Sequence, residues 1–171
     1  MTNKYNPPFT ITEEITNLVI EIAELVGIIY MSKKLTSNPI LRRENRIKTI
    51  YSSLAIEQNT LTLEQITDII AGKRILAPPK DIKEVKNAYE IYEKLDTLNP
   101  YSIKDLLKAH KIMTLELIGE SGCFRSKNVG VYQGSKLIHT GTPPQYIPEL
   151  MKQLFLWLKK SEVHSLIKSC V

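Results

Sequence analysis

The sequence predicts a mainly α-helical fold with one β-hairpin. Apolar residues recur at steps of three and four through most of the chain, helix-capping residues precede those stretches, and only one short region has the composition of paired strands. The 171 residues are 43% hydrophobic and 24% charged. That composition is ordinary for a globular protein with a hydrophobic core.

Two helices are predicted in the first sixty residues. The first spans residues 12–33 and has Thr12 as its N-cap. We expect its apolar face to pack against the rest of the chain. The second helix begins at the capping signal of Ser37, Asn38 and Pro39 and runs to about Glu57. The apolar face of the first helix consists of Ile15, Leu18, Val19, Ile22, Leu25, Val26 and Ile29.

Three further helices follow. Thr62 and Gln65 form a capping box that opens a short helix, which Gly72 closes. The next helix is expected to start at Asp81 and to bury Val85, Ala88, Tyr89, Tyr92 and Leu95 before Pro100 ends it. Another starts at Ser102 with Asp105 three residues later and continues to Leu117.

The one β-hairpin is predicted from residues 129–132 and 136–140. These runs contain β-branched and aromatic residues and are joined by Gln133, Gly134 and Ser135. Beyond it, apolar periodicity predicts a sixth helix through Leu158 and the start of a seventh at Leu166. We predict a single domain, in which residues 1–60 form the N-terminal helices and residues 61–171 form the first part of a compact core that includes the hairpin.

Charge and cysteine content narrow the classes of function. There are 23 basic and 18 acidic residues, and the basic ones are dispersed, which favours a solvated surface over a nucleic-acid interface. Cys123 and Cys170 lack the spacing of a zinc site or a disulfide framework, so no metal site is predicted. Glu21 and Glu24 interrupt the most apolar segment, and we predict a cytoplasmic protein without a membrane partner.

Six segments together resemble Fic (Fido) proteins that carry their own N-terminal inhibitory helix. The segments occur in family order and at family spacing, and the resemblance extends from about residue 8 to the end of the chain. It implies a protein adenylyltransferase, which transfers AMP from ATP to a hydroxyl group of a target protein with the help of Mg²⁺. The segments are residues 52–62, 70–74, 84–89, 106–110, 122–131 and 143–158.

The catalytic loop of that family is not in this sequence. The loop reads H-P-F-x-[DE]-G-N-G-R-x-x-R, whereas none of His110, His139 and His164 is followed by Pro-Phe. The last residues resemble the helix that precedes the loop in the family. We therefore expect a C-terminally truncated Fic domain that holds no catalytic residue, binds neither ATP nor Mg²⁺ productively, and is inactive as given.

The family's inhibitory motif is Ser or Thr, three residues, Glu, and then Gly or Asn. Ser53 and Glu57 match it and share one face of a helix. Gln58 replaces the small residue, and we expect it to extend the helix so that Asn59 ends it. In relatives the glutamate pairs with the last arginine of the loop, where the ATP γ-phosphate would lie. Spacing alone favours a solvated acid at a helix end, and it is the family resemblance that favours the inhibitory role.

The hairpin corresponds to the family flap, whose edge holds the target segment by strand addition. A purely structural hairpin that covers the core is the alternative. Arg125 is a candidate for contact with the nucleotide, although a lone arginine is more often a surface charge. The resemblance implies that the target-binding residues are Val131, Tyr132, Lys136, Leu137, Ile138 and His139.

Other functions stay open at this point. The chain would also suit an inhibitor in trans, an antitoxin-like module that offers Glu57 to an intact Fic protein. Basic residues near the start of the second helix, Arg42, Arg43, Arg46 and Lys48, leave a helical nucleic-acid binder as a less favoured alternative. We also expect self-association, because apolar residues of the last helices would lack partners: Leu154, Phe155, Leu166 and Ile167.

Overall fold

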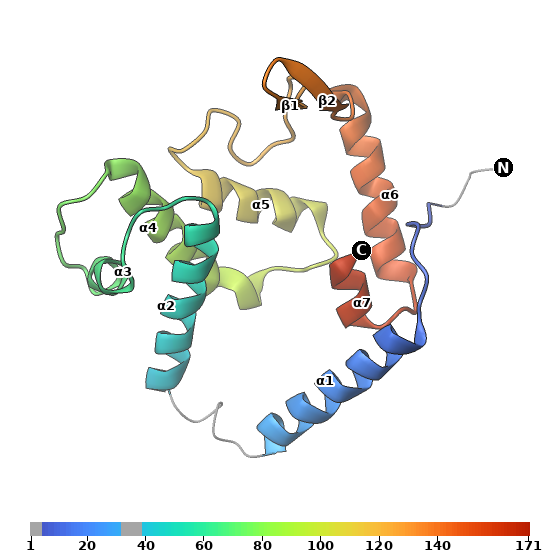
Figure 1. The fold of residues 1–171 in the computed structure, drawn as a ribbon, viewed down its shortest axis with the longest axis horizontal. Coiled ribbons are helices and arrows are strands. Elements are labelled where there is room, and N and C mark those ends of the chain that lie inside the picture. Colours follow the sequence, from blue (N-terminus) through green and yellow to red (C-terminus); the bar gives the residue numbers. More distant parts are fainter. Residues whose placement is uncertain (1–4, 32–38) are drawn as a thin grey trace. The chain divides into compact units, whose positions relative to one another are not determined.

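The computed structural model describes residues 5–31 and 39–171 (Figure 1). Within these residues it has seven α-helices and a two-stranded antiparallel sheet, which confirms the predicted fold class. Contacts divide the chain into two compact units. Of the described residues, the first unit, here called the N-terminal unit, comprises 6–31, 39–67 and 162–171, and the second, the hairpin unit, comprises Tyr5 and 68–161. This grouping differs from the predicted division after residue 60.

Helix α1, Glu13–Met31, belongs to the N-terminal unit. Thr12 caps it as predicted, because the Ile15 N–H donates to Thr12 Oγ1 at 3.2 Å. The expectation that its apolar face is packed was wrong for the described residues. No residue of α1 is buried, and Leu25 is 53% exposed. Periodicity identifies the apolar face of a helix but does not say what covers it.

Helix α2, Pro39–Ile56, and helix α7, Ser165–Cys170, also belong to this unit. α2 buries Ile47, Ile50 and Leu54, which stand at steps of three and four. The capping signal that was predicted at Ser37 and Asn38 lies outside the described residues, as does the predicted end of the first helix.

Helix α3, Leu63–Ile70, is opened by the predicted capping box. The Gln65 N–H donates to Thr62 Oγ1 at 3.2 Å, and the Thr62 N–H donates to Gln65 Oε1 at 2.9 Å. Gly72 closes the helix with a φ of 81°, a conformation that glycine adopts without steric cost. These local signals placed both ends of the helix correctly.

Helix α4, Pro79–Lys94, and helix α5, Ile103–Thr114, pack together in the hairpin unit. α4 begins at Pro79 and not at Asp81, because proline suits the first turn of a helix. Leu95 begins a short 3₁₀ helix and is 54% exposed, so its predicted burial was wrong. Ser102 caps α5 as predicted, accepting from the Asp105 N–H at 3.2 Å.

A buried amide joins these two helices. Asn87 on α4 is 3% exposed, and its Nδ2 donates to Met113 O at 3.1 Å and to Leu115 O at 2.9 Å. These two carbonyls lie at the C-terminal end of α5, where the helix has no partners of its own for them. Asn87 therefore caps α5 from a neighbouring helix.

The hairpin follows α5 and leads into the last helix of the unit. Its strands are β1, Gly130–Gln133, and β2, Lys136–Thr140, and they lie beside the start of α6 in Figure 1. A 3₁₀ turn, Pro144–Tyr146, connects β2 to α6, Ile147–Lys160, on which Trp157 is buried. No helix in the described ranges combines the length and hydropathy that a membrane span requires.

Candidate functional site

The C-terminal end of α2 is a closed helix terminus. The Gln58 N–H donates to Ala55 O at 3.1 Å, and the Asn59 N–H donates to Leu54 O at 3.0 Å. These two bonds form a Schellman motif, which requires a left-handed residue at its centre. Gln58 provides it with a φ of 66°. The expectation that Gln58 extends the helix was therefore wrong: Gln58 ends it, and Asn59 completes the terminus.

Ser53 and Glu57 are exposed at this end of α2. Their spacing of four residues puts both side chains on one side of the helix. Glu57 stands where the negative end of the helix dipole disfavours a carboxylate by about 0.3–1 kcal/mol. Among the described residues it forms no salt bridge. Helix stability therefore gives no reason for a glutamate at this position.

The hairpin has a two-residue loop of Gly134 and Ser135, one residue shorter than predicted. Gly134 has a φ of 61°, and this combination fits a type II′ turn. Val131 pairs with His139 and Tyr132 pairs with Leu137. Ile138 is therefore the extra residue of a β-bulge, which increases the local twist of the strand.

Both strands leave an open edge. In a hairpin with a two-residue loop, the pair beside the loop exchanges hydrogen bonds, so the next pair, Tyr132 and Leu137, turns its N–H and C=O groups outward. Tyr132 is 63% exposed, and no residue of β2 is buried. All six predicted flap residues are thus accessible, and the role of the hairpin as a cover for the core gains no support.

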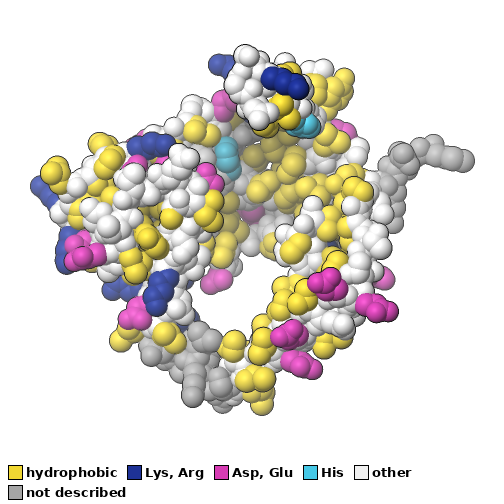
Figure 2. Space-filling view, in the orientation of Figure 1, with side chains coloured by type: hydrophobic (Ala, Val, Ile, Leu, Met, Phe, Trp, Pro, Cys, Tyr) yellow, Lys and Arg dark blue, Asp and Glu magenta, His cyan; other side chains and the backbone are white. Residues whose placement is uncertain are grey.

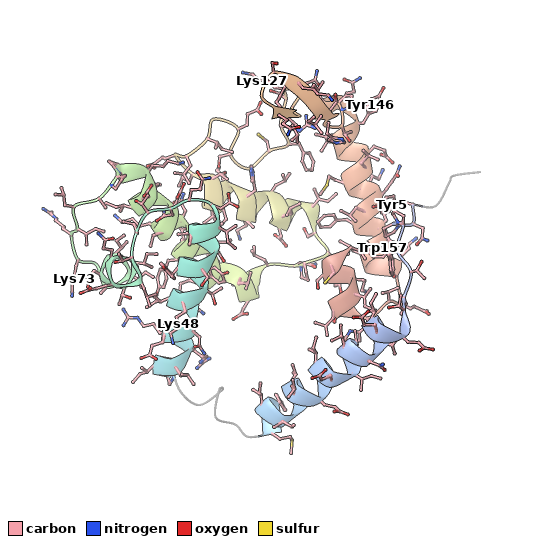
Figure 3. All side chains as sticks on the ribbon, viewed as in Figure 1. Tyr5, Lys48, Lys73, Lys127, Tyr146 and Trp157 are labelled. Atoms are coloured by element: carbon pink, nitrogen blue, oxygen red, sulfur yellow. The ribbon has the colours of Figure 1, made fainter. Side chains whose placement is uncertain are left out.

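Arg125 lies at the base of the hairpin, here called the hairpin neck and comprising residues 125–129 and 141–142. Its Nη1 donates to Lys127 O at 2.7 Å, and its Nη2 donates to Thr142 O. The two carbonyls belong to the two opposite legs of the hairpin; Figure 3 labels Lys127 beside the strands. The half-buried guanidinium thus joins the legs. Contact of Arg125 with a nucleotide stays a prediction.

A carboxylate holds the residue next to Arg125. Glu120 accepts hydrogen bonds from the Ser126 N–H, at 3.0 Å for Oε2, and from the Ser126 hydroxyl. The hydroxyl bond lowers the pKa of Glu120 most, followed by the backbone bond and the nearby charge of Lys127, while desolvation opposes them. Glu120 is therefore held in its ionised form to lower pH than an ordinary glutamate.

Each of the three histidines lies at a different element. His110 is half-buried on α5, where its Nδ1 accepts from the Gly122 N–H at 3.0 Å. His164 is the N-cap of α7 and accepts from the Leu166 N–H at 3.3 Å, and His139 is exposed on β2. In the part of the chain that the structure describes, no three metal-ligating side chains come together.

A shallow cavity of about 340 Å³ lies at the start of α4. Its lining includes Lys80 and Lys83, which are already paired with carboxylates. Lys80 Nζ lies 3.6 Å from Glu84, and Lys83 Nζ lies 2.8 Å from Glu116. Because these cations are neutralised, the cavity is not favoured as an anion site.

No family model matches the chain. It is similar to the crystal structure of a Fic family protein from Desulfovibrio desulfuricans G20, with a TM-score of 0.89 and 46% sequence identity. The match covers 97% of this chain and 51% of that one, so the chain spans about half the length of the matched protein. At this identity, and over nearly all of its residues, the chain belongs to the Fic family.

Proposed function

We propose that this chain supplies two working parts of a Fic-type AMP transferase. One part is Glu57 at the end of α2, which keeps the γ-phosphate of ATP out of the active site. The other is the edge of the hairpin, which holds an extended segment of the target protein. AMP transfer itself requires the histidine and the glycine-rich loop of the family motif, which these 171 residues do not contain.

One observation carries the inhibitory role. Ser53 and Glu57 stand exposed on one side of a helix whose end is closed directly after them, in a chain that is 46% identical to a Fic family protein. The Schellman motif fixes the backbone at Glu57, so the carboxylate is presented from a defined position. A carboxylate so placed is suited to a bidentate pair with an arginine, such as the last one of the family loop.

A second candidate function is inhibition in trans. It is favoured by the exposure of Glu57 and by the lack of a salt-bridge partner for it among the described residues. The arginine that it would engage belongs to another chain in this case. ATP and Mg²⁺ would then bind to the partner protein. The cytoplasmic location of this chain stays a prediction.

The experiment combines this polypeptide with a Fic AMP transferase that has the catalytic loop but lacks an inhibitory helix. We expect the polypeptide alone to transfer no label from ATP tagged at the α-phosphate. In the mixture, wild type should slow labelling of the target, whereas Glu57→Gln should not. Glu44→Gln is the matched control, because Glu44 is an exposed glutamate on the same helix.

Two results would contradict the proposal. Label transferred by the pure polypeptide would show that it has chemistry of its own. Equal inhibition by wild type and Glu57→Gln would remove the glutamate from the mechanism. If neither variant inhibits, the trans function is excluded.

The cis function is then tested by joining residues 1–171 to the loop-bearing half of a Fic enzyme. AMP transfer by this chimera is compared with AMP transfer by its Glu57→Gln variant, which should be faster.

A further inference from the structure

The hairpin neck carries an inference about Arg125 that rests on the proposed target-binding role of the hairpin. Strand addition aligns the backbone of the bound peptide with that of the receiving strand. A strand edge therefore selects a peptide only if the strand itself has a fixed direction relative to the rest of the protein. An isolated two-stranded hairpin is only marginally stable in water. Contacts outside the two strands must therefore hold β1 and β2 in one orientation.

The two legs of the neck approach each other closely. The Gly141 N–H donates to Val129 O at 2.8 Å, which closes the ladder just outside the strands. A Cβ atom on Gly141 would lie 2.8 Å from Val129 Cγ2, 3.1 Å from Val129 O and 3.4 Å from Arg125 Nη2. Only a residue without a side chain fits there without displacing the opposite leg.

Arg125 spans both legs at this point. Its planar guanidinium directs N–H donors from two nitrogens, and each nitrogen reaches a carbonyl on a different leg, Lys127 O and Thr142 O. A lysine ammonium is a compact point charge and does not reproduce this fork. The contact therefore depends on the planar geometry of the arginine guanidinium as well as on its charge.

The neck is in turn tied to α5. Glu120 accepts from both the N–H and the hydroxyl of Ser126, the residue after Arg125. Directly after Glu120, Ser121 Oγ donates to Lys111 O at 2.9 Å, and the Gly122 N–H donates to His110 Nδ1 at 3.0 Å. Hydrogen bonds, linked by the peptide bonds between Glu120 and Ser121 and between Arg125 and Ser126, thus connect α5 to the far leg of the hairpin.

We propose that Arg125 is a positioning residue for target binding: it holds the hairpin in the orientation in which an exposed strand edge receives an extended peptide. It acts through the neck and does not touch the peptide itself. This assignment differs from contact with the nucleotide, since the guanidinium is engaged by two backbone carbonyls.

Amide hydrogen exchange on the 171-residue chain tests this proposal without any ligand. In Arg125→Met, which keeps an unbranched apolar stem and removes both donor nitrogens, exchange of the Val131 and His139 amides should be at least tenfold faster, because both hydrogen bonds of the guanidinium are lost. Exchange of the Val85 and Ile91 amides in α4 should not change. Arg125→Lys should lie between wild type and Arg125→Met.

Lys83→Met is the control variant, because it removes a cation and a salt bridge of the same unit away from the neck. It should leave exchange in the hairpin unchanged. The inference is overturned if Arg125→Met exchanges in the hairpin at the wild-type rate, or if it accelerates α4 and the hairpin equally, which would indicate general destabilisation.

A peptide array separates this inference from the proposed function. The probes are short extended peptides that each contain one Ser, Thr or Tyr. Binding by wild type and Lys83→Met, with at least tenfold weaker binding by Arg125→Met at unchanged thermal stability, supports the positioning role. Equal binding by Arg125→Met overturns it. If wild type binds no peptide, the target-binding function fails, while the exchange result still decides whether Arg125 orders the hairpin.

Discussion

At the scale of single residues, Gln58 shows how a backbone conformation constrains a functional motif. The Schellman motif at the end of α2 requires φ > 0 at this position, and the family pattern has Gly or Asn there, the residues that adopt this conformation most readily. Helix propensity alone predicts that Gln58 continues the helix, which is why that prediction was wrong. Gln58 nevertheless adopts the left-handed conformation, so the helix ends directly after Glu57 as the Schellman motif requires.

This conformation leads to a stability prediction. A left-handed non-glycine residue costs roughly 1–2 kcal/mol, and the greater freedom of glycine in the unfolded chain offsets part of the gain. We expect Gln58→Gly to stabilise the protein by about 0.5–1 kcal/mol, measured as a higher midpoint of urea denaturation at unchanged slope. Gln58→Ala serves as the control and should bring no gain. A lower midpoint for Gln58→Gly would show that Gln58 is not left-handed in solution.

At the scale of elements, the hairpin neck should respond to pH. The pKa of Glu120 is lowered from its ordinary value of 4.5, chiefly by the hydroxyl of Ser126. A carboxyl group with a depressed pKa in the folded state contributes stability above its unfolded pKa and loses it as pH falls through the folded pKa. The stabilising contribution of Glu120 is therefore present at neutral pH and lost in acid.

The measurement compares the urea denaturation of wild type with that of Glu120→Gln from neutral to acidic pH. The greater free energy of unfolding of wild type relative to Glu120→Gln should be fully present above about pH 5. It should disappear as the pH falls below the pKa of Glu120 in the folded state. Ser126→Ala removes the hydroxyl that lowers the pKa of Glu120 most. The free energy of unfolding should therefore depend less on pH in Ser126→Ala than in wild type. A difference between wild type and Glu120→Gln that stays constant from neutral to acidic pH would exclude the role of ionisation.

The elements themselves were largely predictable, whereas their contacts were not. Thr12, Thr62, Ser102 and Gly72 mark helix ends through bonds to residues a few positions away, so the sequence contains the signal. Arg125 reaches a carbonyl seventeen residues away, and Asn87 reaches two more than twenty-five residues away. No local pattern specifies such partners. The family resemblance drew attention to the hairpin and to the end of α2 but not to the hydrogen bonds of the neck.

At the scale of the whole molecule, the described residues leave much apolar surface uncovered. Hydrophobic side chains lie along the surface of α1 next to acidic ones (Figure 2), and none of them is buried. The residues that the sequence suggested as the cause of self-association, such as Leu154 and Ile167, are half-buried and not fully exposed. Continuous exposed apolar surface favours association. The face of α1 is therefore a stronger source of association than α6 or α7.

This comparison leads to a prediction for the polypeptide in solution. Light scattering should give a mean mass above the 19.5 kDa of one chain, rising with concentration. Replacing Leu18 and Leu25 on α1 by serine should lower it, because both leucines contribute to the same exposed face. Leu76→Ser is the matched control: Leu76 is 100% exposed but stands outside the helices, so its loss should have no effect. A mass of one chain at every concentration would show that α1 is covered in solution or does not drive association.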